Sequence, residues 1–311
     1  MATEPIVAAL DVQVQHSRSP ARPSFLSDYW SLTKPEINLL IAVTAAVGFW
    51  MGVPASPSHF PWASLFNTLL GSMLVSSGAA TLNQLIESRF DAQMRRTARR
   101  PLASGRIEPL SALWFGICLT VFGAIDLAIS TNALASLLTI LTLLAYLFVY
   151  TPLKRKTPLC TLIGAVPGAA PPLIGWAAAS GHLTADAWLL FAIVFLWQFP
   201  HFMSIAWMYR EDYGRAGYLV LPAGERKDTF VAWQCLLPAL GLFAVALVPA
   251  LRGQSGIVYF VGALVLGGVF LYYSARFALQ RSIACARQLL FASILYLPVL
   301  FALLALDKKR M

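Results

Sequence analysis

Nine long apolar segments, separated by polar connections, are the feature that most constrains how this 311-residue chain can fold. A helix needs about 20 mostly apolar residues to cross the hydrocarbon core of a bilayer. Because unpaired backbone groups are costly in hydrocarbon, segments of this kind have to be helical. We therefore predict an all-α, polytopic membrane protein, a bundle of about nine transmembrane helices. The segments are 36–53, 62–87, 109–130, 133–151, 158–180, 185–208, 229–250, 256–276 and 286–306.

Amino-acid composition argues against a soluble protein. Hydrophobic residues make up 58% of the chain and charged residues only 12%, whereas a soluble domain usually has roughly 25% charged residues. The length suits a single membrane domain, which we expect over residues 35–306. Residues 1–34 are polar, include acidic residues and lack the apolar core of a secretory signal. We predict that they form a flexible cytoplasmic N-terminal tail of a bacterial inner-membrane protein.

Basic residues are distributed unevenly between the two ends of the predicted helices. With the N-terminus inside, 19 of the 23 lysines and arginines fall on the inner side. This asymmetry predicts that the N-terminus and the longer loops are cytoplasmic. The same asymmetry accounts for the net charge of +9. We therefore do not expect a nucleic-acid partner. The exceptions are Arg252, Lys308, Lys309 and Arg310, of which the last three conflict with the orientation.

The end of the second apolar segment carries the strongest chemical signal. Asn83, Glu87 and Asp91 are spaced four residues apart, so on a helix they share one face. An amide and two carboxylates supply the oxygen ligands that suit Mg²⁺ bound to phosphate, and the nearby Arg96 and Arg100 suit the phosphate itself. The pattern indicates a metal–diphosphate site; the alternative is that the acids only neutralise arginines that hold the topology. Asn83 favours the site, because an unsatisfied amide inside an apolar segment is costly.

A second acidic cluster follows the sixth apolar segment, on the same side of the membrane. It consists of Glu211 and Asp212, flanked by Tyr209 and Tyr213. Two acidic clusters on one side could bracket a single diphosphate together with two or three magnesium ions. The alternative is a solvated charged loop.

A third polar cluster follows the fourth apolar segment and contains Tyr150, Lys154 and Arg155. Lys154 offers a compact positive charge to a phosphate, and Tyr150 offers a hydroxyl. The alternative is a basic cluster that only sets the topology.

His201 lies inside the sixth apolar segment, 11 residues before Asp212. On one continuous helix this spacing brings the two residues to within about 20° of the same face, with a rise of roughly 16 Å. Ionisable residues inside a membrane are usually functional, so we predict that His201 contacts a substrate deeper in the bilayer than Asp212. The alternative is a histidine whose hydrogen bonds are satisfied within the core.

Over residues 30–305 the chain resembles the UbiA superfamily of intramembrane prenyltransferases. The stretch from Asn83 is similar to the acidic signature of this family, NxxxDxxxD followed by MxRTxxRPL, with Glu87 in place of the first aspartate. The second family motif, DxxxD, falls on Tyr209 and Tyr213, so Glu211 and Asp212 have to supply its carboxylates. Further matching stretches, some of them typical of members that act on heme, are 32–35 (LTKP), 150–155 (YTPLKR), 168–176 (GAAPPLIGW) and 197–202 (WQFPHF).

The resemblance implies transfer of a farnesyl group from farnesyl diphosphate to the vinyl group of heme b, with Mg²⁺ as the cofactor and heme as a substrate. The products would be heme O and diphosphate. We expect the catalytic residues to be Asn83, Glu87, Asp91, Lys154 and Asp212, and the metal ligands to be Asn83, Glu87, Asp91, Glu211 and Asp212. The expected substrate-binding residues are Arg96, Arg100, Tyr150, Arg155, His201, Tyr209, Glu211 and Tyr213.

The sequence is also compatible with two other functions. One is prenyl transfer by another member of the family to an aromatic acid or a tetrapyrrole alcohol. The other is transport of heme or an anion, which would need polar groups at the middle of the membrane reached from both sides. The charge gathered on one side favours the enzyme. The partners that we expect are the lipid bilayer and a downstream heme-modifying enzyme or terminal oxidase.

Overall fold

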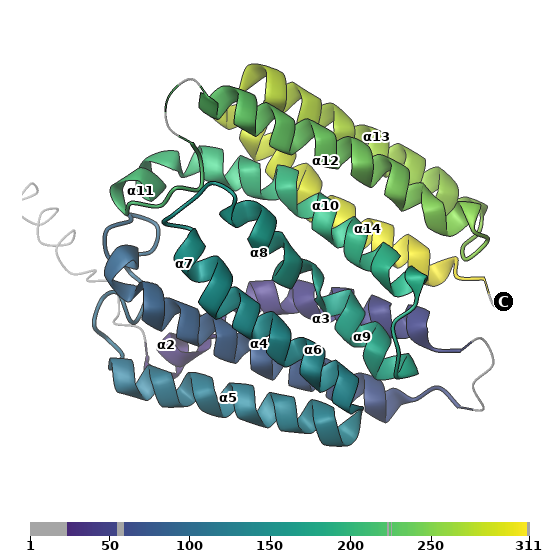
Figure 1. Cartoon of the computed structure of the whole chain (residues 1–311), viewed down its shortest axis with the longest axis horizontal. Coiled ribbons are helices and arrows are strands. Elements are labelled where there is room, and N and C mark those ends of the chain that lie inside the picture. The colour runs from purple at the N-terminus through teal and green to yellow at the C-terminus, as the bar shows by residue number, and fades with distance from the viewer. Residues whose placement is uncertain (1–23, 55–58, 223, 225, 310–311) are drawn as a thin grey trace, which may run out of the picture.

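The computed structural model describes residues 24–54, 59–222, 224 and 226–309. Within these ranges the regular structure consists of helices and one isolated β-bridge, joined by turns and loops (Figure 1). The N-terminal tail expected over residues 1–34 lies outside the described residues up to residue 23. The helices are α2 (Phe25–Leu32), α3 (Pro35–Gly52), α4 (Trp62–Asp91), α5 (Pro109–Ser130), α6 (Ala133–Leu144), α7 (Thr151–Leu153), α8 (Cys160–Ala169), α9 (Pro171–Ser180), α10 (Ala185–Met208), α11 (Arg210–Arg215), α12 (Arg226–Leu251), α13 (Ile257–Gln280) and α14 (Ile283–Leu306).

The prediction of a nine-helix membrane bundle is confirmed. By length and composition, nine helical segments in the described ranges are long and apolar enough to cross a membrane. Two of these segments are composite. In one, α6 continues through a π-helical turn, η1 (Ala145–Tyr150), into α7; in the other, α8 and α9 meet at Ala170, where Pro171 begins the new helix. Pro171 cannot donate a backbone hydrogen bond, which explains why the two helices are offset there.

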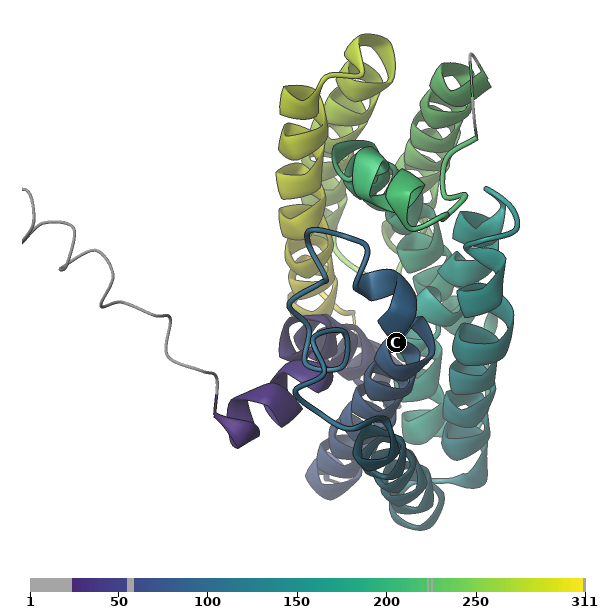
Figure 2. The same ribbon diagram turned by 90° about the vertical axis from the view of Figure 1, so that its left-hand side faces the viewer.

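The helices pack side by side, and seen end-on they form a ring (Figure 2). The helix α3 packs on α9, and α4 packs on α5. The helix α12 packs on α10 and α13, and α14 packs on α10, α13 and α3. The contact of α14 with α3 joins the last helix to the first membrane helix. The loop between α4 and α5 and the short helix α11 lie over the same end of this ring (Figure 2).

Glycines allow α4 and α5 to approach closely. A Cβ atom on Gly78 would lie 2.6 Å from the carbonyl oxygen of Gly116, and one on Gly123 would lie 2.6 Å from that of Gly71. Such small residues are typical of tightly packed membrane helices, where packing rather than water exclusion drives association. This contact holds the polar C-terminal end of α4 at a fixed place in the bundle.

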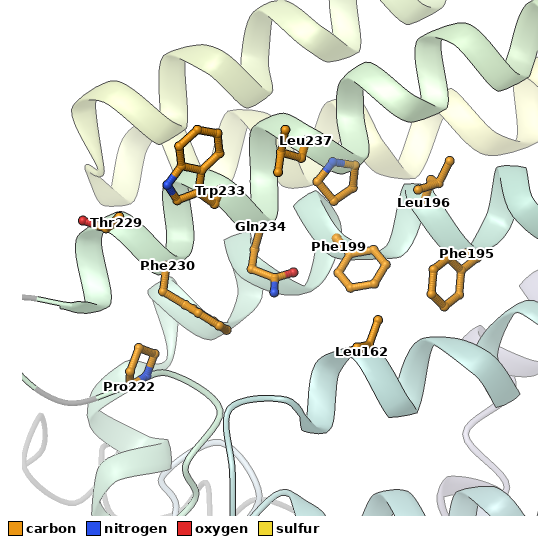
Figure 3. Close-up of a pocket in the computed structure, with 11 residues that line it drawn as sticks. Leu162, Phe195, Leu196, Phe199, Pro222, Thr229, Phe230, Trp233, Gln234 and Leu237 are labelled. Atoms are coloured by element: carbon orange, nitrogen blue, oxygen red, sulfur yellow. The ribbon is translucent and has the colours of Figure 1, made fainter.

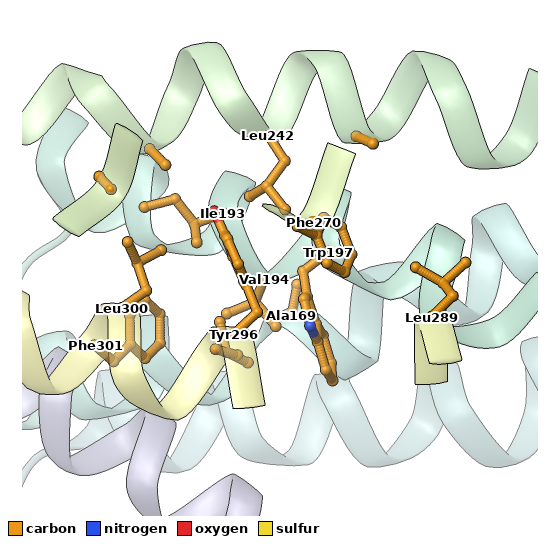
Figure 4. Close-up of a cluster of buried hydrophobic side chains, with 14 of the residues drawn as sticks. Ala169, Ile193, Val194, Trp197, Leu242, Phe270, Leu289, Tyr296, Leu300 and Phe301 are labelled. Carbon is orange, nitrogen blue, oxygen red and sulfur yellow. The ribbon is translucent and has the colours of Figure 1, made fainter. Parts of the chain in front are cut away.

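The largest apolar core lies among α10, α12, α13 and α14 (Figure 4). Trp197, Phe270, Tyr296 and Phe301 are buried there, and the ring centroids of Phe270 and Tyr296 lie 4.9 Å apart. Large, interlocking side chains of this kind keep α10 and α14 from shifting against each other. The position of His201 on α10 therefore depends on this core.

Residues 25–32, within the expected tail, form the helix α2. Its Asp28 is buried and accepts hydrogen bonds from the Arg106 guanidinium, in an ion pair of 2.9 Å. The opposite side of α2 exposes Phe25, Leu26 and Trp30. This division is typical of a helix that lies at the membrane surface, with apolar side chains toward the lipid.

The basic C-terminus lies at the end of the bundle opposite the loop between α4 and α5. There the Lys308 Nζ donates hydrogen bonds to the carbonyl oxygens of Trp50, Met51 and Val53, at distances of 2.8, 3.3 and 3.0 Å. These carbonyls end α3, where the helix dipole attracts a positive charge. Lys308 thus has a structural role at the end where the distribution of basic residues disfavoured it.

Candidate functional site

The polar face predicted on α4 is buried at the end of that helix. Asn83, Glu87 and Asp91 are 1%, 6% and 1% exposed, respectively. The Asn83 amide donates a 2.8 Å hydrogen bond to Glu87 Oε2, one helical turn further on. Buried carboxylates are stable only when they are paired, so the surrounding cations are part of the site.

Lys154 and Thr151 complete this face from the end of the α6–η1–α7 segment. Lys154 Nζ donates to Glu87 Oε1 at 2.8 Å, and Thr151 Oγ1 donates to Asn83 Oδ1 at 2.8 Å. Burial opposes the charge on Lys154, but the Tyr146 phenol and then the Glu87 carboxylate outweigh it and raise the pKa of Lys154. Lys154 is therefore held protonated beside the acids.

The loop after α4 supplies the second ion pair. Arg100 Nη1 donates to Asp91 Oδ2 at 2.7 Å, and Thr97 Oγ1 donates to the Asp91 backbone carbonyl at 2.9 Å. The guanidinium of Arg96 lies 4.9 Å from the ring centroid of Tyr209. The loop thus folds back over the end of α4 and brings Arg100 to the buried acids, as a phosphate site requires.

Other predicted residues surround this centre. Lys154 Nζ lies 4.6 Å from the ring centroid of Tyr150, so that phenol borders the site. The Arg155 guanidinium lies 4.0 Å from the ring centroid of Phe90 instead of pairing with an acid. A cation stacked on an aromatic ring keeps its hydrogen-bond donors free at the ring edge.

Lys34 is a member of the site that the sequence reasoning missed, although its Lys-Pro motif was noted. It separates α2 from α3 and has a left-handed backbone, with φ of 50°. This conformation is rare outside glycine, and Pro35 disfavours the ordinary helical one. Burial, followed by the positive charges of Arg100 and Lys154, lowers the pKa of Lys34 to about 7, while Glu87 and Asp91 oppose this shift. Lys34 therefore shares the electrostatic environment of the acidic face.

Two buried amides fix the α2–α3 junction against α4. The Gln84 side chain donates to the Leu32 carbonyl at 2.9 Å. The Asn38 side chain donates to the Thr33 carbonyl at 2.9 Å and to the Ser77 hydroxyl at 2.7 Å. The bonds to Leu32 and Ser77 join segments 52 and 39 residues apart, so the sequence gives no local sign that Lys34 lies near α4.

The second acidic cluster is arranged differently from the first. Asp212 is paired with Arg215 on the same helix, α11, and Glu211 is exposed. The tyrosines of this region lie closer to the first cluster. The rings of Tyr213 and Tyr218 meet edge to face at 6.0 Å, and Tyr218 lies beside Glu87.

Tyr218 is a second member that the sequence did not indicate. Burial, then the Glu87 carboxylate, raises the pKa of Tyr218. Its buried hydroxyl lies beside the Glu87 carboxylate and interacts with it. Tyr218 therefore borders the acidic face of α4 at Glu87.

The residues at this centre fit a magnesium–diphosphate ligand. Mg²⁺ needs only one or two carboxylates, because substrate phosphates and water supply its other ligands. Glu87 and Asp91 supply those carboxylates, and Arg100 and Lys154 supply positive charge for the phosphates. No group of three or more histidine, cysteine or acidic side chains suited to a metal lies within the described ranges, so the site does not resemble an all-protein metal cage.

His201 is not on one continuous helix with Asp212, as the spacing argument assumed. The helix α10 ends at Met208, and Tyr209 leaves the helical conformation before α11 begins. Arg210 donates to the Trp207 carbonyl at 2.9 Å, across this break. The prediction of a shared helical face is therefore wrong, whereas His201 does lie deeper, seven residues and about 10 Å before the end of α10.

A separate cavity of about 770 Å³ lies among α8, α10 and α12 (Figure 3). Phe195, Phe199, Phe230 and Trp233 form much of its wall, and Gln234 points into it from α12. Its lining residues include no acid, lysine or arginine. This cavity can accept apolar material but does not suit a diphosphate.

The fold and the site together define a multi-pass membrane protein with a buried centre of mixed charge at one end of its helical bundle. The chain belongs to the UbiA prenyltransferase family, whose conserved domain matches residues 41–295. It is 46% identical to protoheme IX farnesyltransferase from Solibacter usitatus over 289 residues, covering 91% of this chain and 99% of that protein. It is 44% identical to the protein of the same name from Salinibacter ruber, again over 91% of this chain and 99% of the relative. The chain is therefore a prenyltransferase.

Solved structures share the fold at low sequence identity. A UbiA homologue from Aeropyrum pernix K1 superposes with a TM-score of 0.71 and 21% identity, covering 88% of this chain and 98% of that one. A UbiA homologue from Archaeoglobus fulgidus bound to GPP and Mg²⁺ has a TM-score of 0.58 and 17% identity, covering 89% and 99%. These similarities establish the helical arrangement as that of the family.

Proposed function

We propose that the protein transfers a farnesyl group from farnesyl diphosphate to the vinyl group of protoheme IX, which is heme b, and releases diphosphate. The substrates are taken from the names of relatives that are more than 40% identical over almost their whole length. The structural observation that carries the proposal is the buried face of Glu87 and Asp91, each paired with a cation at 2.8 or 2.7 Å. Transport of heme or an anion is not favoured, because this centre lies at one end of the bundle.

In this reaction the bond between the farnesyl C1 and a diphosphate oxygen breaks, and C1 bonds to the terminal carbon of the vinyl group. The positive charge left on the adjacent vinyl carbon is discharged when a water molecule adds there and loses a proton, so the product carries a hydroxyl group. Negative charge grows on the leaving diphosphate. Lys154 and Arg100 carry fixed positive charge beside the acids, so they stabilise that growing charge without rearranging. The Tyr218 hydroxyl, beside Glu87, could donate a hydrogen bond to a phosphate oxygen.

Magnesium, when bound, would screen the diphosphate and make it a better leaving group. Glu87 and Asp91 are the residues of the first cluster that would hold it, and Asn83 would supply an amide oxygen. Asp212 and Glu211 stay proposed ligands from the second cluster. The apolar side chains of the surrounding membrane helices would keep water away from the reactive allylic group until its carbon–carbon bond has formed.

Product analysis tests the function directly. Purified protein in lipid, supplied with protoheme IX, farnesyl diphosphate and Mg²⁺, is expected to yield a farnesylated heme that chromatography separates from heme b. Assays with an aromatic acid or a tetrapyrrole alcohol in place of heme test the other prenyl acceptors. Conversion of one of these, with heme b left unchanged, would contradict the proposed substrate.

Removal of divalent metal is expected to stop the reaction, because two buried carboxylates and an anionic substrate would otherwise repel each other. Turnover is measured before chelation, after chelation, and after Mg²⁺ is restored. Recovery of the rate on adding Mg²⁺ supports the magnesium site. An undiminished rate in metal-free buffer would show that the acids serve another purpose.

We also propose that the site faces the cytoplasm of a bacterial cell, within the inner membrane, where a heme-modifying enzyme or terminal oxidase could use the product. With the exposed Cys118 replaced by serine and the buried Cys160, Cys235 and Cys285 kept, a cysteine introduced at the exposed Ser104 should react with a membrane-impermeant thiol reagent only in inverted vesicles. A cysteine at the exposed His182, at the other end of the bundle, is the matched control and should react in intact spheroplasts. The reverse pattern would place the site outside.

A further inference from the structure

His201 is held at the contact between α10 and α14 by a single polar neighbour. Its Nδ1 atom lies 2.7 Å from the Oγ of Ser293, which is completely buried on α14. The ring also stacks on Trp197, with centroids 4.7 Å apart and an interplanar angle of 23°. Trp197 in turn donates from Nε1 to the Ser293 backbone carbonyl at 2.9 Å. Figure 4 shows this indole among the buried side chains of the core.

The hydrogen bonds of Ser293 determine which nitrogen of His201 carries the proton. The Ser293 hydroxyl has one hydrogen, and its oxygen lies 2.6 Å from the Leu290 carbonyl, which can only accept. The hydroxyl therefore donates to Leu290 and has only lone pairs to offer to the ring. Nδ1 of His201 must then be the protonated nitrogen, and in the neutral ring Nε2 has an unshared electron pair.

Nε2 has no hydrogen-bond partner in the part of the chain that the structure describes, and the ring is half-buried. A neutral imidazole nitrogen with a free electron pair is a strong ligand for iron. It cannot donate a hydrogen bond to a propionate. The tautomer thus favours contact with an iron atom over contact with a propionate.

We propose that Nε2 of His201 coordinates the iron of the tetrapyrrole substrate, and that Ser293 is a positioning residue that fixes the tautomer for this bond. This inference rests on the proposed function, since it needs an iron tetrapyrrole as a substrate. Histidine ligands in metal sites commonly donate their second nitrogen to an oxygen, which orients the ring. Here the ring is oriented before the substrate arrives, about 10 Å below the end of α10.

The test is a titration of the full-length protein in detergent with ferric protoporphyrin IX and, separately, with metal-free protoporphyrin IX. Wild type should shift the Soret band of the ferric compound to that of an imidazole complex. His201→Ala should lose this spectrum and regain it with added free imidazole, which also shows that the variant is folded. Binding of the metal-free compound should be unchanged, because it has no iron to coordinate.

Ser293→Ala should weaken binding of ferric protoporphyrin IX by roughly 10- to 100-fold, the usual effect of losing such a supporting group. Ser293→Thr, which keeps a hydroxyl, should recover part of the loss. The matched control is Ser274→Ala, which removes an equally buried hydroxyl on α13 that has no hydrogen-bond partner among the described residues.

Three results would overturn the inference. If His201→Ala gives the wild-type Soret spectrum and affinity while farnesyl transfer to heme continues, His201 is a core residue and the proposed function still stands. If wild type neither binds ferric protoporphyrin IX nor converts it, the inference and the proposed function fail together. An equal loss of both porphyrins in His201→Ala would assign the ring to packing against the macrocycle and not to the iron.

Discussion

Replacing Asp91 with asparagine is expected to lower farnesyl transfer by about 100-fold or more. The substitution keeps the shape of the side chain but removes a buried negative charge that is 2.7 Å from Arg100. Without that charge the site should hold Mg²⁺ and its diphosphate less tightly. Steady-state turnover, together with titration of a non-reactive farnesyl diphosphate analogue, measures both effects. Binding of heme should change little, since His201 lies on another helix.

The matched control for this experiment is Asp28→Asn. Asp28 is also buried at this end of the bundle and also pairs with an arginine, Arg106, at 2.9 Å. Its loss removes one charge without touching the residues around Glu87, so turnover per folded molecule should stay near that of wild type. If the two variants lose turnover equally, Asp91 acts through folding rather than through the diphosphate.

The membrane fold could be predicted from the sequence because the bilayer leaves few alternatives. Every backbone group within hydrocarbon has to be paired inside its own helix, so apolar length alone located the nine spans. The details that depend on contacts between distant segments could not be predicted in this way. Lys308 is an example. It donates hydrogen bonds to the carbonyls of Trp50 and Val53, and these contacts could not be predicted from the distribution of basic residues along the chain.

In the candidate site, too, local patterns could be predicted from the sequence and contacts between distant segments could not. The spacing of Asn83 and Glu87 is local, and the structure joins them by a hydrogen bond within one helix. Lys34 and Tyr218 are distant in sequence from these residues, and only the packing of other segments on α4 brings them near Glu87. The break at Tyr209 was missed for a different reason, because a periodic argument assumes a continuous helix.

Substitutions in the ion pair of Glu87 and Lys154 can show whether these residues act in catalysis or only neutralise each other's charge. Their charged atoms lie 2.8 Å apart, with side chains 8% and 14% exposed. Glu87→Gln or Lys154→Met alone leaves one charge buried without its partner, which should destabilise the protein by about 3 kcal/mol. Each single variant should also lose about 100-fold or more in turnover, because it removes a group placed to meet the metal or the diphosphate.

The double variant, Glu87→Gln with Lys154→Met, separates these two effects. It leaves no unpaired charge, so thermal unfolding in detergent should return toward the wild-type temperature. If both side chains serve the diphosphate, turnover should nevertheless stay as low as in the worse single variant, since neither function is restored. If the acids only neutralise nearby cations, as the alternative reading of this segment holds, turnover should recover together with stability. Recovery of stability without recovery of turnover is therefore the result that we expect from an enzyme in which both side chains serve the diphosphate and its metal.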